Sequence, residues 1–126
     1  MPLETLNKKT IYMLMSVMNA QHRIPISKFI MDRGSIPIYP SIISDFYPIS
    51  KKLATGLDRE TNDDMIKRAD ELWVFGELSN KMVEEIKSAK RLGKGVKYFD
   101  IAGMPRSIRE ITENEVKFEK GFRIEK

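Results

Sequence analysis

Apolar residues in this chain gather into short runs, and these runs alternate with segments whose apolar residues recur every three to four positions. Short apolar runs bounded by polar residues are typical of strands that are buried on both faces of a sheet. The pattern predicts four strands, at residues 10–18, 35–43, 71–76 and 95–101. Because Pro37 and Pro40 have no backbone N–H, the second strand is predicted to be short, around residues 36–39, and near a sheet edge.

Three segments between or beside these runs have helical spacing. The predicted helices are residues 25–33, residues from about 58 to 69, and residues 79–92. The last of these is the clearest, because Ser79 or Asn80 is a favourable cap for its start and Gly93 for its end. Residues 44–56 are polar and irregular, which predicts a loop. Residues 106–126 fit a short helix, an edge strand or a tail equally well.

This alternation predicts an α/β protein whose parallel strands are joined by helical crossovers. We expect one domain over residues 1–126, built as a three-layer sandwich with a parallel sheet of four to five strands. In such sheets, ligands bind beyond the carboxyl ends of the strands. Functional residues are therefore expected just after the predicted strands, at residues 19–23, 41–46, 76–81 and 102–105.

Composition and charge narrow the classes of function. Lys and Arg number 22 against 18 Asp and Glu, and the net charge of +4 is spread thinly, so no nucleic-acid partner is expected. No Cys and a single His argue against thiolate or imidazole metal sites, and no metal or cofactor is expected. No apolar run approaches the roughly 18 residues that span a bilayer, and no signal-peptide stretch occurs, which predicts a cytoplasmic protein without a membrane partner. Neither a Rossmann dinucleotide motif nor a P-loop motif occurs.

Glu85 is the most informative candidate for chemistry. On a helix over residues 79–92, Met82, Ile86 and Ala89 share one face, and Glu85 falls inside this apolar arc. A carboxylate on the inner face of a helix costs free energy unless a partner or a reaction uses it. The plain alternative, which the pattern favours equally, is a glutamate at the rim of the apolar face that extends to solvent or pairs with an arginine.

Asn62 occupies a similar position on the helix predicted before residue 70. Its amide falls on the same arc as Met65 and Ile66, whereas Asp63 and Asp64 point more toward solvent and fit capping charges. The simpler role for Asn62 is a local hydrogen bond to the backbone in the first helical turn.

Longer stretches of the sequence are recognisable. Residues 69–76 read ADELWVFG, and residues 79–99 read SNKMVEEIKSAKRLGKGVKYF. Together with the stretch GSIPIYPSII at residues 34–43, they resemble the nucleoside 2-deoxyribosyltransferase-like superfamily. The resemblance implies a flavodoxin-like, doubly wound sheet that acts on a nucleoside or a nucleotide.

The resemblance also implies roles for individual residues. Glu85 would be the nucleophile that attacks the anomeric carbon of the sugar and releases the base. Ser79 would bind a 5′-phosphate, and its alternative role as the helix cap is compatible with that. Asn19 and Gln21, after the first strand, would line the base or sugar side of the pocket, although Asn19 fits a turn-capping role as well.

Two positions depart from the family's pattern. Lys81 replaces the glycine that precedes the methionine, and its added charge either clamps a phosphate or narrows the site. Asn62 stands where many members have an aspartate, and an amide forms hydrogen bonds but is no proton-accepting base. Both changes keep a non-catalytic role open beside the enzymatic one.

We therefore expect an enzyme that cleaves or transfers the N-glycosidic bond of a nucleoside or nucleoside 5′-monophosphate through Glu85. The alternatives are a non-catalytic nucleotide-binding or sensing domain of the same fold, and a structural protein in which Glu85 is a paired rim charge. Because members of the superfamily commonly assemble, a homodimer or a larger assembly is expected. Residues 44–56 and 106–126 are the expected contact segments, since both carry apolar residues that a monomer would have to cover.

Overall fold

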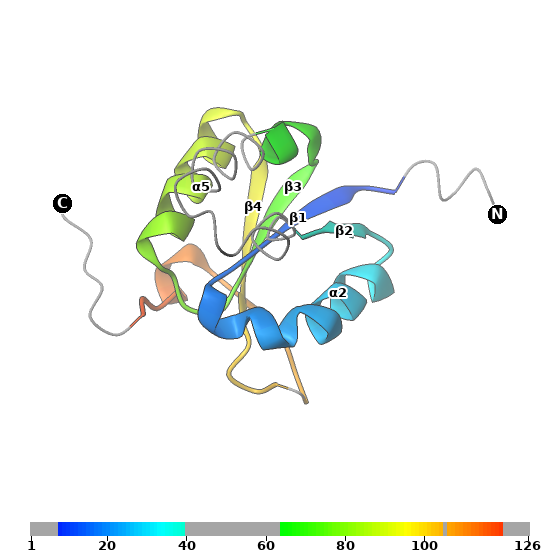
Figure 1. Ribbon diagram of the computed structural model, residues 1–126, viewed down its shortest axis with the longest axis vertical. Coiled ribbons are helices and arrows are strands. Elements are labelled where there is room, and N and C mark those ends of the chain that lie inside the picture. Colours follow the sequence, from blue (N-terminus) through cyan, green and yellow to red (C-terminus); the bar gives the residue numbers. More distant parts are fainter. Residues whose placement is uncertain (1–7, 40–63, 105, 120–126) are drawn as a thin grey trace, which may run out of the picture.

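The fold of the 126-residue chain is given by a computed structural model (Figure 1). The structure describes residues 8–39, 64–104 and 106–119. The loop predicted at residues 44–56, Asn62 and the first part of the second predicted helix lie outside the described residues.

Five strands form one sheet in the order β2-β1-β3-β4-β5. The parallel strands are β1 (Thr10–Met15), β2 (Ile36–Ile38), β3 (Glu71–Phe75) and β4 (Gly95–Asp100). This confirms the predicted α/β class and the sheet of four to five strands. The fifth strand, β5 (Arg109–Ile111), runs antiparallel to β4, because the connection of residues 101–108 is too short for the crossover that parallel pairing needs.

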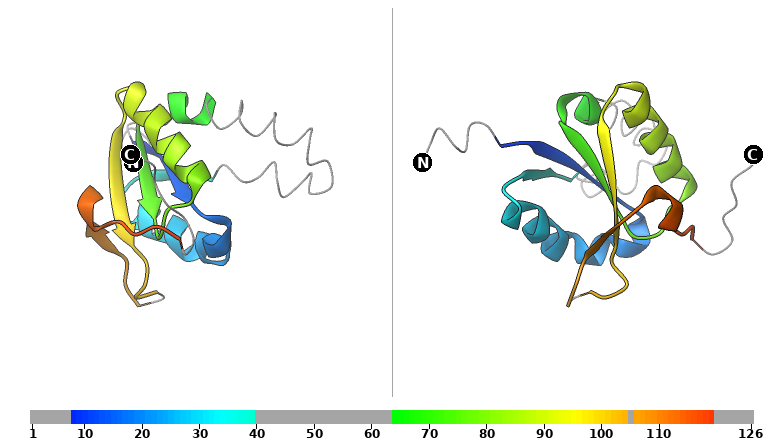
Figure 2. Two further views of the ribbon diagram at one scale, coloured as in Figure 1. Left: turned by 90° about the vertical axis from the view of Figure 1, so that its left-hand side faces the viewer. Right: turned by 180° about the vertical axis from the view of Figure 1, so that it is seen from behind.

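Helices lie on both faces of this sheet (Figures 1 and 2). Adjacent residues of a strand point to opposite faces. Tyr12 packs in one core cluster with residues of α5 (Asn80–Arg91) and of the helical segment 64–68, whereas Met13 packs in another with residues of α2 (Arg23–Asp32). The two clusters are the two helix–sheet interfaces of a three-layer sandwich.

The first strand is shorter than predicted. It ends at Met15, the last residue that pairs with β3, and the chain then turns into the 3₁₀ helix η1 (Val17–His22). The end of β3 is marked by Gly76, whose φ of 87° is in the left-handed region that glycine favours. The segments that leave β1 and β3 thus begin at the same edge of the sheet.

The C-terminal segment belongs to the fold as far as Glu119. After β5 it forms the short 3₁₀ helix η2 (Glu113–Glu115) and then runs beside the start of α5 (Figure 2). The backbone N–H of Leu78 donates to the carbonyl of Lys117, and the N–H of Glu119 donates to the carbonyl of Leu78, both at 2.9 Å. Of the structures open for residues 106–126, the described part contains both an edge strand, β5, and a short helix, η2.

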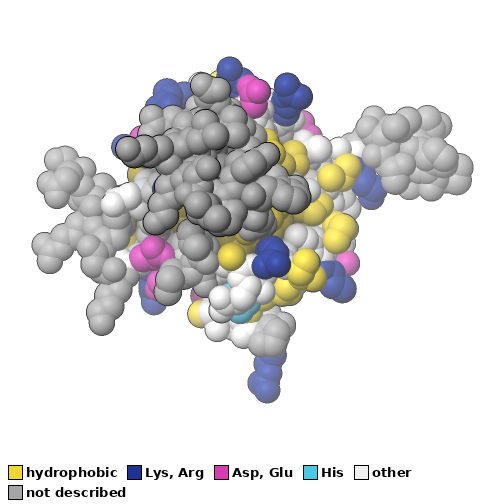
Figure 3. Space-filling view, viewed as in Figure 1, with side chains coloured by type: hydrophobic (Ala, Val, Ile, Leu, Met, Phe, Trp, Pro, Cys, Tyr) yellow, Lys and Arg dark blue, Asp and Glu magenta, His cyan; other side chains and the backbone are white. Residues whose placement is uncertain are grey.

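Some hydrophobic side chains reach the surface, beside α2 and β2 in Figure 3, where Ile24, Met31 and Ile36 are exposed. None of the helices within the described ranges is long and apolar enough to span a bilayer.

Candidate functional site

Helix α5 brings Glu85 onto the sheet. Ser79 caps the helix, because its hydroxyl oxygen accepts a hydrogen bond from the backbone N–H of Met82 at 3.4 Å. The helix buries Met82, Ile86 and Ala89, and Glu85 is buried among them with only 9% of its surface exposed. The predicted placement of Glu85 on the inner face is confirmed, and a rim side chain extending to solvent is not what the structure has.

Tyr12 is the partner of Glu85 across the helix–sheet interface. Its side chain is fully buried in the centre of β1, and its hydroxyl donates to Oε2 of Glu85 at 3.3 Å. This distance is longer than the usual O–H···O bond, so the contact orients the carboxylate more than it stabilises it. Tyr12 was not among the residues singled out from the sequence. Its signal was a tyrosine inside an apolar run, whose hydroxyl needs a polar neighbour once buried.

Glu84, the residue before Glu85, points to the opposite side of α5. The side chain of Glu84 is 76% exposed and lies 4.0 Å from the ammonium of Lys87, one turn along the surface of α5. Glu84 is thus an ordinary surface charge, whereas Glu85 lies in an apolar cluster where a charge costs free energy.

Ser79 and Lys81 lie at the first turn of the same helix. The hydroxyl of Ser79 is engaged as the cap, which confirms the simpler of its two roles, and the phosphate role stays a prediction. Lys81 is exposed. Its ammonium therefore does not contribute to the buried surroundings of Glu85.

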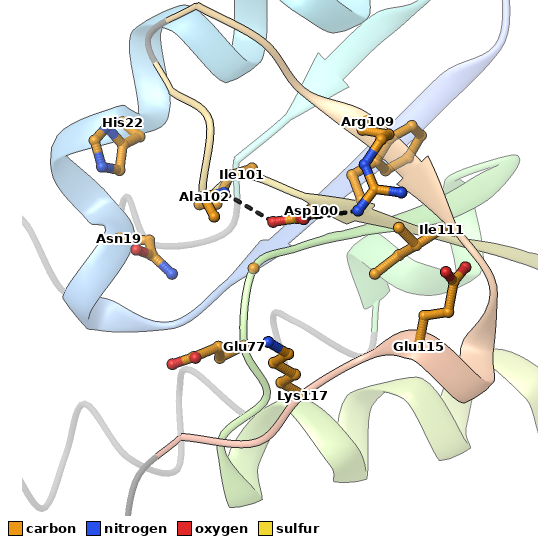
Figure 4. Close-up of a pocket in the computed structure, with 12 residues that line it drawn as sticks. Asn19, His22, Glu77, Asp100, Ile101, Ala102, Arg109, Ile111, Glu115 and Lys117 are labelled. Carbon is orange, nitrogen blue, oxygen red and sulfur yellow. Dashed lines mark hydrogen bonds and ion pairs between the residues drawn. The ribbon is translucent and has the colours of Figure 1, made fainter.

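A cavity of about 430 Å³ opens at the carboxyl ends of β3 and β4 (Figure 4). Residues from η1, from the turn after β3, from the end of β4 and from the C-terminal segment line it. Three of the four segments expected to carry function contribute lining residues, namely residues 19–23, 76–81 and 102–105. Residues 41–46 lie outside the described residues.

An ion pair lies in the wall of this cavity. Arg109 donates to Oδ2 of Asp100 at 3.1 Å, and the backbone N–H of Ala102 donates to Oδ1 of Asp100 at 2.8 Å (Figure 4). The pKa of Asp100 is lowered from its ordinary value, chiefly by the bond from Ala102 and further by Arg109 and the nearby charge of Lys117, against an opposing effect of burial. Asp100 is therefore a firmly ionised acceptor.

Among the predicted site residues that the structure describes, Asn19 lines the cavity. Its amide lies over Gly76, where an added Cβ would come within 2.7 Å of Nδ2. Gln21, its neighbour on η1, is exposed and is not among the lining residues. Glu85, Ser79 and Lys81 do not line this cavity either, so the structure brings Asn19 and Glu85 to the same sheet but not to the same described cavity.

We also searched the part of the chain that the structure describes for residues that could bind a metal ion. No group of three or more His, Asp or Glu side chains there is arranged to hold a metal ion.

The chain is similar to a protein family and to a solved structure, which are described next. The model of a family described as a domain of unknown function, DUF7768, matches residues 12–99. A search of curated proteins finds no match. Among solved structures, the fold is similar to that of the Clostridium botulinum CMP N-glycosidase BcmB, with a TM-score of 0.50, 18% sequence identity, and coverage of 73% of this chain and 71% of that chain. The chain thus shares the α/β fold of that N-glycosidase.

Proposed function

For this chain, which belongs to the DUF7768 family, we propose an enzyme that cleaves or transfers the N-glycosidic bond of a nucleoside or nucleoside 5′-monophosphate, with Glu85 as its nucleophile. The fold shared with a CMP N-glycosidase supports the class of reaction. The burial of Glu85 supports the proposal that the reaction takes place at this residue.

The observation that carries the proposal is the burial of Glu85 against Tyr12. A helix gains stability by burying apolar side chains, and a carboxylate in their midst works against that gain. Buried, partly dry carboxylates are common at catalytic sites, where nucleophiles need a fixed position and little competing water.

The reaction would proceed in two displacements. A carboxylate oxygen of Glu85 attacks the anomeric carbon, the C–N bond breaks, and its electron pair leaves with the base, which takes up a proton. The sugar is then held as an ester of Glu85. Water, or a second base, attacks the same carbon, loses a proton, and releases the carboxylate with net retention of configuration.

Tyr12 acts in this scheme by positioning the nucleophile. Its hydroxyl contacts Oε2 of Glu85 at 3.3 Å and so orients the carboxylate. β1 fixes Tyr12 through pairing with strands on both sides, at Ile38 of β2 and Leu72 of β3. A nucleophile that is held by a rigid strand loses little entropy when it takes up its reactive orientation.

The substrate contacts follow from the start of α5. The helix N-terminus carries a partial positive charge, and Lys81 adds a full one close by, which favours a phosphorylated nucleoside over a free one. Asn62, Asn19 and Gln21 remain the proposed contacts to sugar and base. The amide of Asn62, which is no proton-accepting base, favours one second candidate, a nucleotide-binding domain without turnover.

A panel assay tests the proposal. The protein is incubated with the common nucleosides and their 5′-monophosphates, and free base is separated by chromatography. We expect release of base from at least one substrate, and its loss in Glu85→Gln, because the amide keeps the shape of the side chain but is a far poorer nucleophile.

The matched control is Glu84→Gln, which makes the same chemical change one residue away on the exposed side of α5. Its turnover should equal that of the parent protein. Base release that survives Glu85→Gln would place the chemistry elsewhere. If no substrate turns over but a monophosphate raises the melting temperature, the non-catalytic candidate holds instead.

A further inference from the structure

The amino ends of the parallel strands form a basic edge of the molecule, which the proposed reaction at Glu85 does not use. We propose that this edge docks a segment of a partner protein that is rich in Asp or Glu and carries apolar side chains between them. This role is independent of turnover at Glu85.

Four described segments lead into the four parallel strands, and together they make up what we call the amino edge. They are residues 8–9, 33–35, 67–70 and 91–94. Pairing in register brings them together, since Thr10 lies opposite Ile36, Ile11 opposite Glu71, and Glu71 opposite Gly95. Neighbouring strands are about 4.8 Å apart, so the four strand starts span only about 15 Å. The amino edge is therefore one continuous surface.

The charge of the amino edge is mostly positive. Its acidic residue is Asp70, and its basic residues are Lys8, Lys9, Arg33, Lys67, Arg68, Arg91 and Lys94. With Glu71, the first residue of β3, counted as well, these seven basic and two acidic groups give a formal charge of +5, against +4 for the whole chain. Figure 3 shows basic side chains along the upper and right-hand rim, where the strand starts lie in Figure 1. The fold thus gathers on one edge a charge that is dispersed along the sequence.

Local contacts leave most of this charge available. The ammonium of Lys9 pairs with Glu71 at 3.0 Å, and the same carboxylate accepts from the indole N–H of Trp73 at 2.8 Å. Asp70 accepts from the backbone N–H and the hydroxyl of Thr10 at 2.7 and 3.3 Å. The other six basic side chains of the amino edge form no ion pair within the described ranges. Both carboxylates are engaged, whereas six cations can still meet a partner.

Helix ends account for only a small part of this charge. The helices α2 and α5 and the helical segment 64–68 all end at the amino edge, where basic side chains offset the partial negative charge of the last carbonyl groups. Each helix end amounts to about half an elementary charge, so three ends offset less than two of the seven basic groups. The excess is left for an anionic partner.

Apolar side chains at the same edge identify this partner as a protein. Leu92 lies within the amino edge, Met31 and Ile36 lie beside it, and all three are exposed. Interfaces between proteins have an apolar core with a polar rim, and they are enriched in Met and Arg. A partner that carried only negative charge would leave these three side chains in water, so the docked segment needs apolar side chains between its carboxylates.

Nucleic acids and membranes fit the amino edge less well. Bases stack on open aromatic rings, but the guanidinium of Arg33 covers the ring of Phe29 at 3.5 Å, and Trp73 is buried. Binding to a membrane surface uses a continuous apolar helix face that is rich in Trp, Phe or Leu. The exposed apolar side chains of the amino edge come instead from separate elements.

Binding of a model peptide to the full chain tests this proposal. The probe is a fluorescent peptide of four Glu-Glu-Leu repeats, measured by anisotropy at constant ionic strength, and Gln-Gln-Leu repeats are the neutral control. We expect saturable binding of the acidic peptide that weakens as salt is added, and no binding of the neutral one. In the ¹⁵N-labelled protein, the acidic peptide should shift the amides of Gly34, Asp70 and Gly93, and it should leave that of Ala102 unchanged.

Matched pairs of substitutions separate the amino edge from net charge alone. Lys67→Gln with Arg68→Gln should weaken the acidic peptide by about fivefold, the size expected for two exposed charge–charge contacts. Arg106→Gln with Lys117→Gln removes the same charge from exposed side chains at the carboxyl ends of the strands and should change the affinity by less than about twofold. Amide spectra show whether each variant is folded. Should the first pair not fold, Lys8→Gln with Arg91→Gln replaces it.

The apolar part of the docking surface has its own variant. Leu92→Gln should weaken the acidic peptide by about twofold, because part of an exposed side chain is no longer covered by apolar groups. It should not change the affinity for a thymidine oligonucleotide of twelve nucleotides, which serves as the nucleic-acid probe. Vesicles of phosphatidylcholine with phosphatidylserine serve as the membrane probe.

The proposal is overturned by any of four results. These are the absence of saturable binding of the acidic peptide, equal weakening by the two pairs of substitutions, amide shifts confined to the carboxyl ends of the strands, and a Leu92→Gln variant that binds the peptide as the parent does. Tighter binding of the oligonucleotide or of the vesicles than of the peptide would also refute it, since the partner would then belong to another class.

Discussion

Replacing Glu85 and Tyr12 together by an apolar pair should make the protein more stable. The variant is Tyr12→Phe with Glu85→Met. Both substitutions nearly conserve volume, so they remove the polar atoms without opening a large cavity. Met also suits the surroundings of Glu85, which are the apolar side chains of a helix–sheet interface.

The magnitude follows from the burial of the two residues and from the contact between them. Glu85 is 9% exposed and Tyr12 is fully buried, so the carboxylate is largely desolvated, and the hydroxyl that faces it is 3.3 Å away. Replacing buried polar or ionic pairs by apolar groups of the same size is commonly neutral or stabilising by about 1–4 kcal/mol, and we expect a gain of about 1–2 kcal/mol here.

The single variants should be less favourable than the pair. Glu85→Met takes an acceptor away from the Tyr12 hydroxyl, and Tyr12→Phe takes a donor away from the Glu85 carboxylate, each at a cost of about 1–3 kcal/mol for a buried polar group. The double-mutant cycle should therefore show positive coupling between the two positions.

Urea unfolding at pH 7, followed by circular dichroism, measures these differences from the midpoint at constant slope. A double variant that is less stable than the parent protein by more than about 1 kcal/mol would refute the reasoning, because the pair would then be a structural element. In that case Glu85 would be explained by stability alone. A gain would mean that the chain keeps a carboxylate at a cost to its stability.

Three further predictions concern the edges of the sheet. Ser79→Ala should lower the free energy of unfolding by about 1 kcal/mol through loss of the cap, which urea unfolding measures, and unchanged stability would contradict the capping contact with Met82. Gly76→Ala should cost about 1–2 kcal/mol for its left-handed φ, and a melting temperature equal to the parent's would count against this. Asp100 should titrate below the ordinary aspartate pKa in carbon-detected NMR. Because its folded-state pKa is lowered, the stability that it contributes is present above the ordinary pKa and is lost as the pH falls through the lowered one, and a midpoint at or above the ordinary value would exclude the stabilising contacts.

The sequence predicts well those elements whose pattern is local. β3, β4 and α5 lie within a few residues of their predicted bounds, because a short apolar run ending in Gly76 and a helix between Ser79 and Gly93 carry their own start and stop signals. The inner position of Glu85 follows from the same helical period. Three-layer architecture follows in turn from the alternation of these elements.

Features that depend on distant residues could not be predicted in this way. The contact of Tyr12 with Glu85 joins residues that are 73 positions apart, and it depends on how α5 is placed over β1. The direction of β5 rests on a three-residue strand whose pattern is too short to separate from a tail. The cavity draws Asn19, Asp100 and Lys117 from three separate segments, each of which is an ordinary polar residue in its own stretch.

Glu85 and the Asp100–Arg109 ion pair lie in different surroundings, and their charges therefore affect the free energy of folding to different degrees. Glu85 lies in an apolar cluster, where little solvent screens it and a charge affects the free energy of folding strongly. Asp100 and Arg109 are open to solvent, their side chains being 35% and 65% exposed, so salt screens them and their contribution to folding is small. Substitutions at Glu85 should therefore change stability and turnover, whereas substitutions at Asp100 or Arg109 should change stability little and less still at high salt.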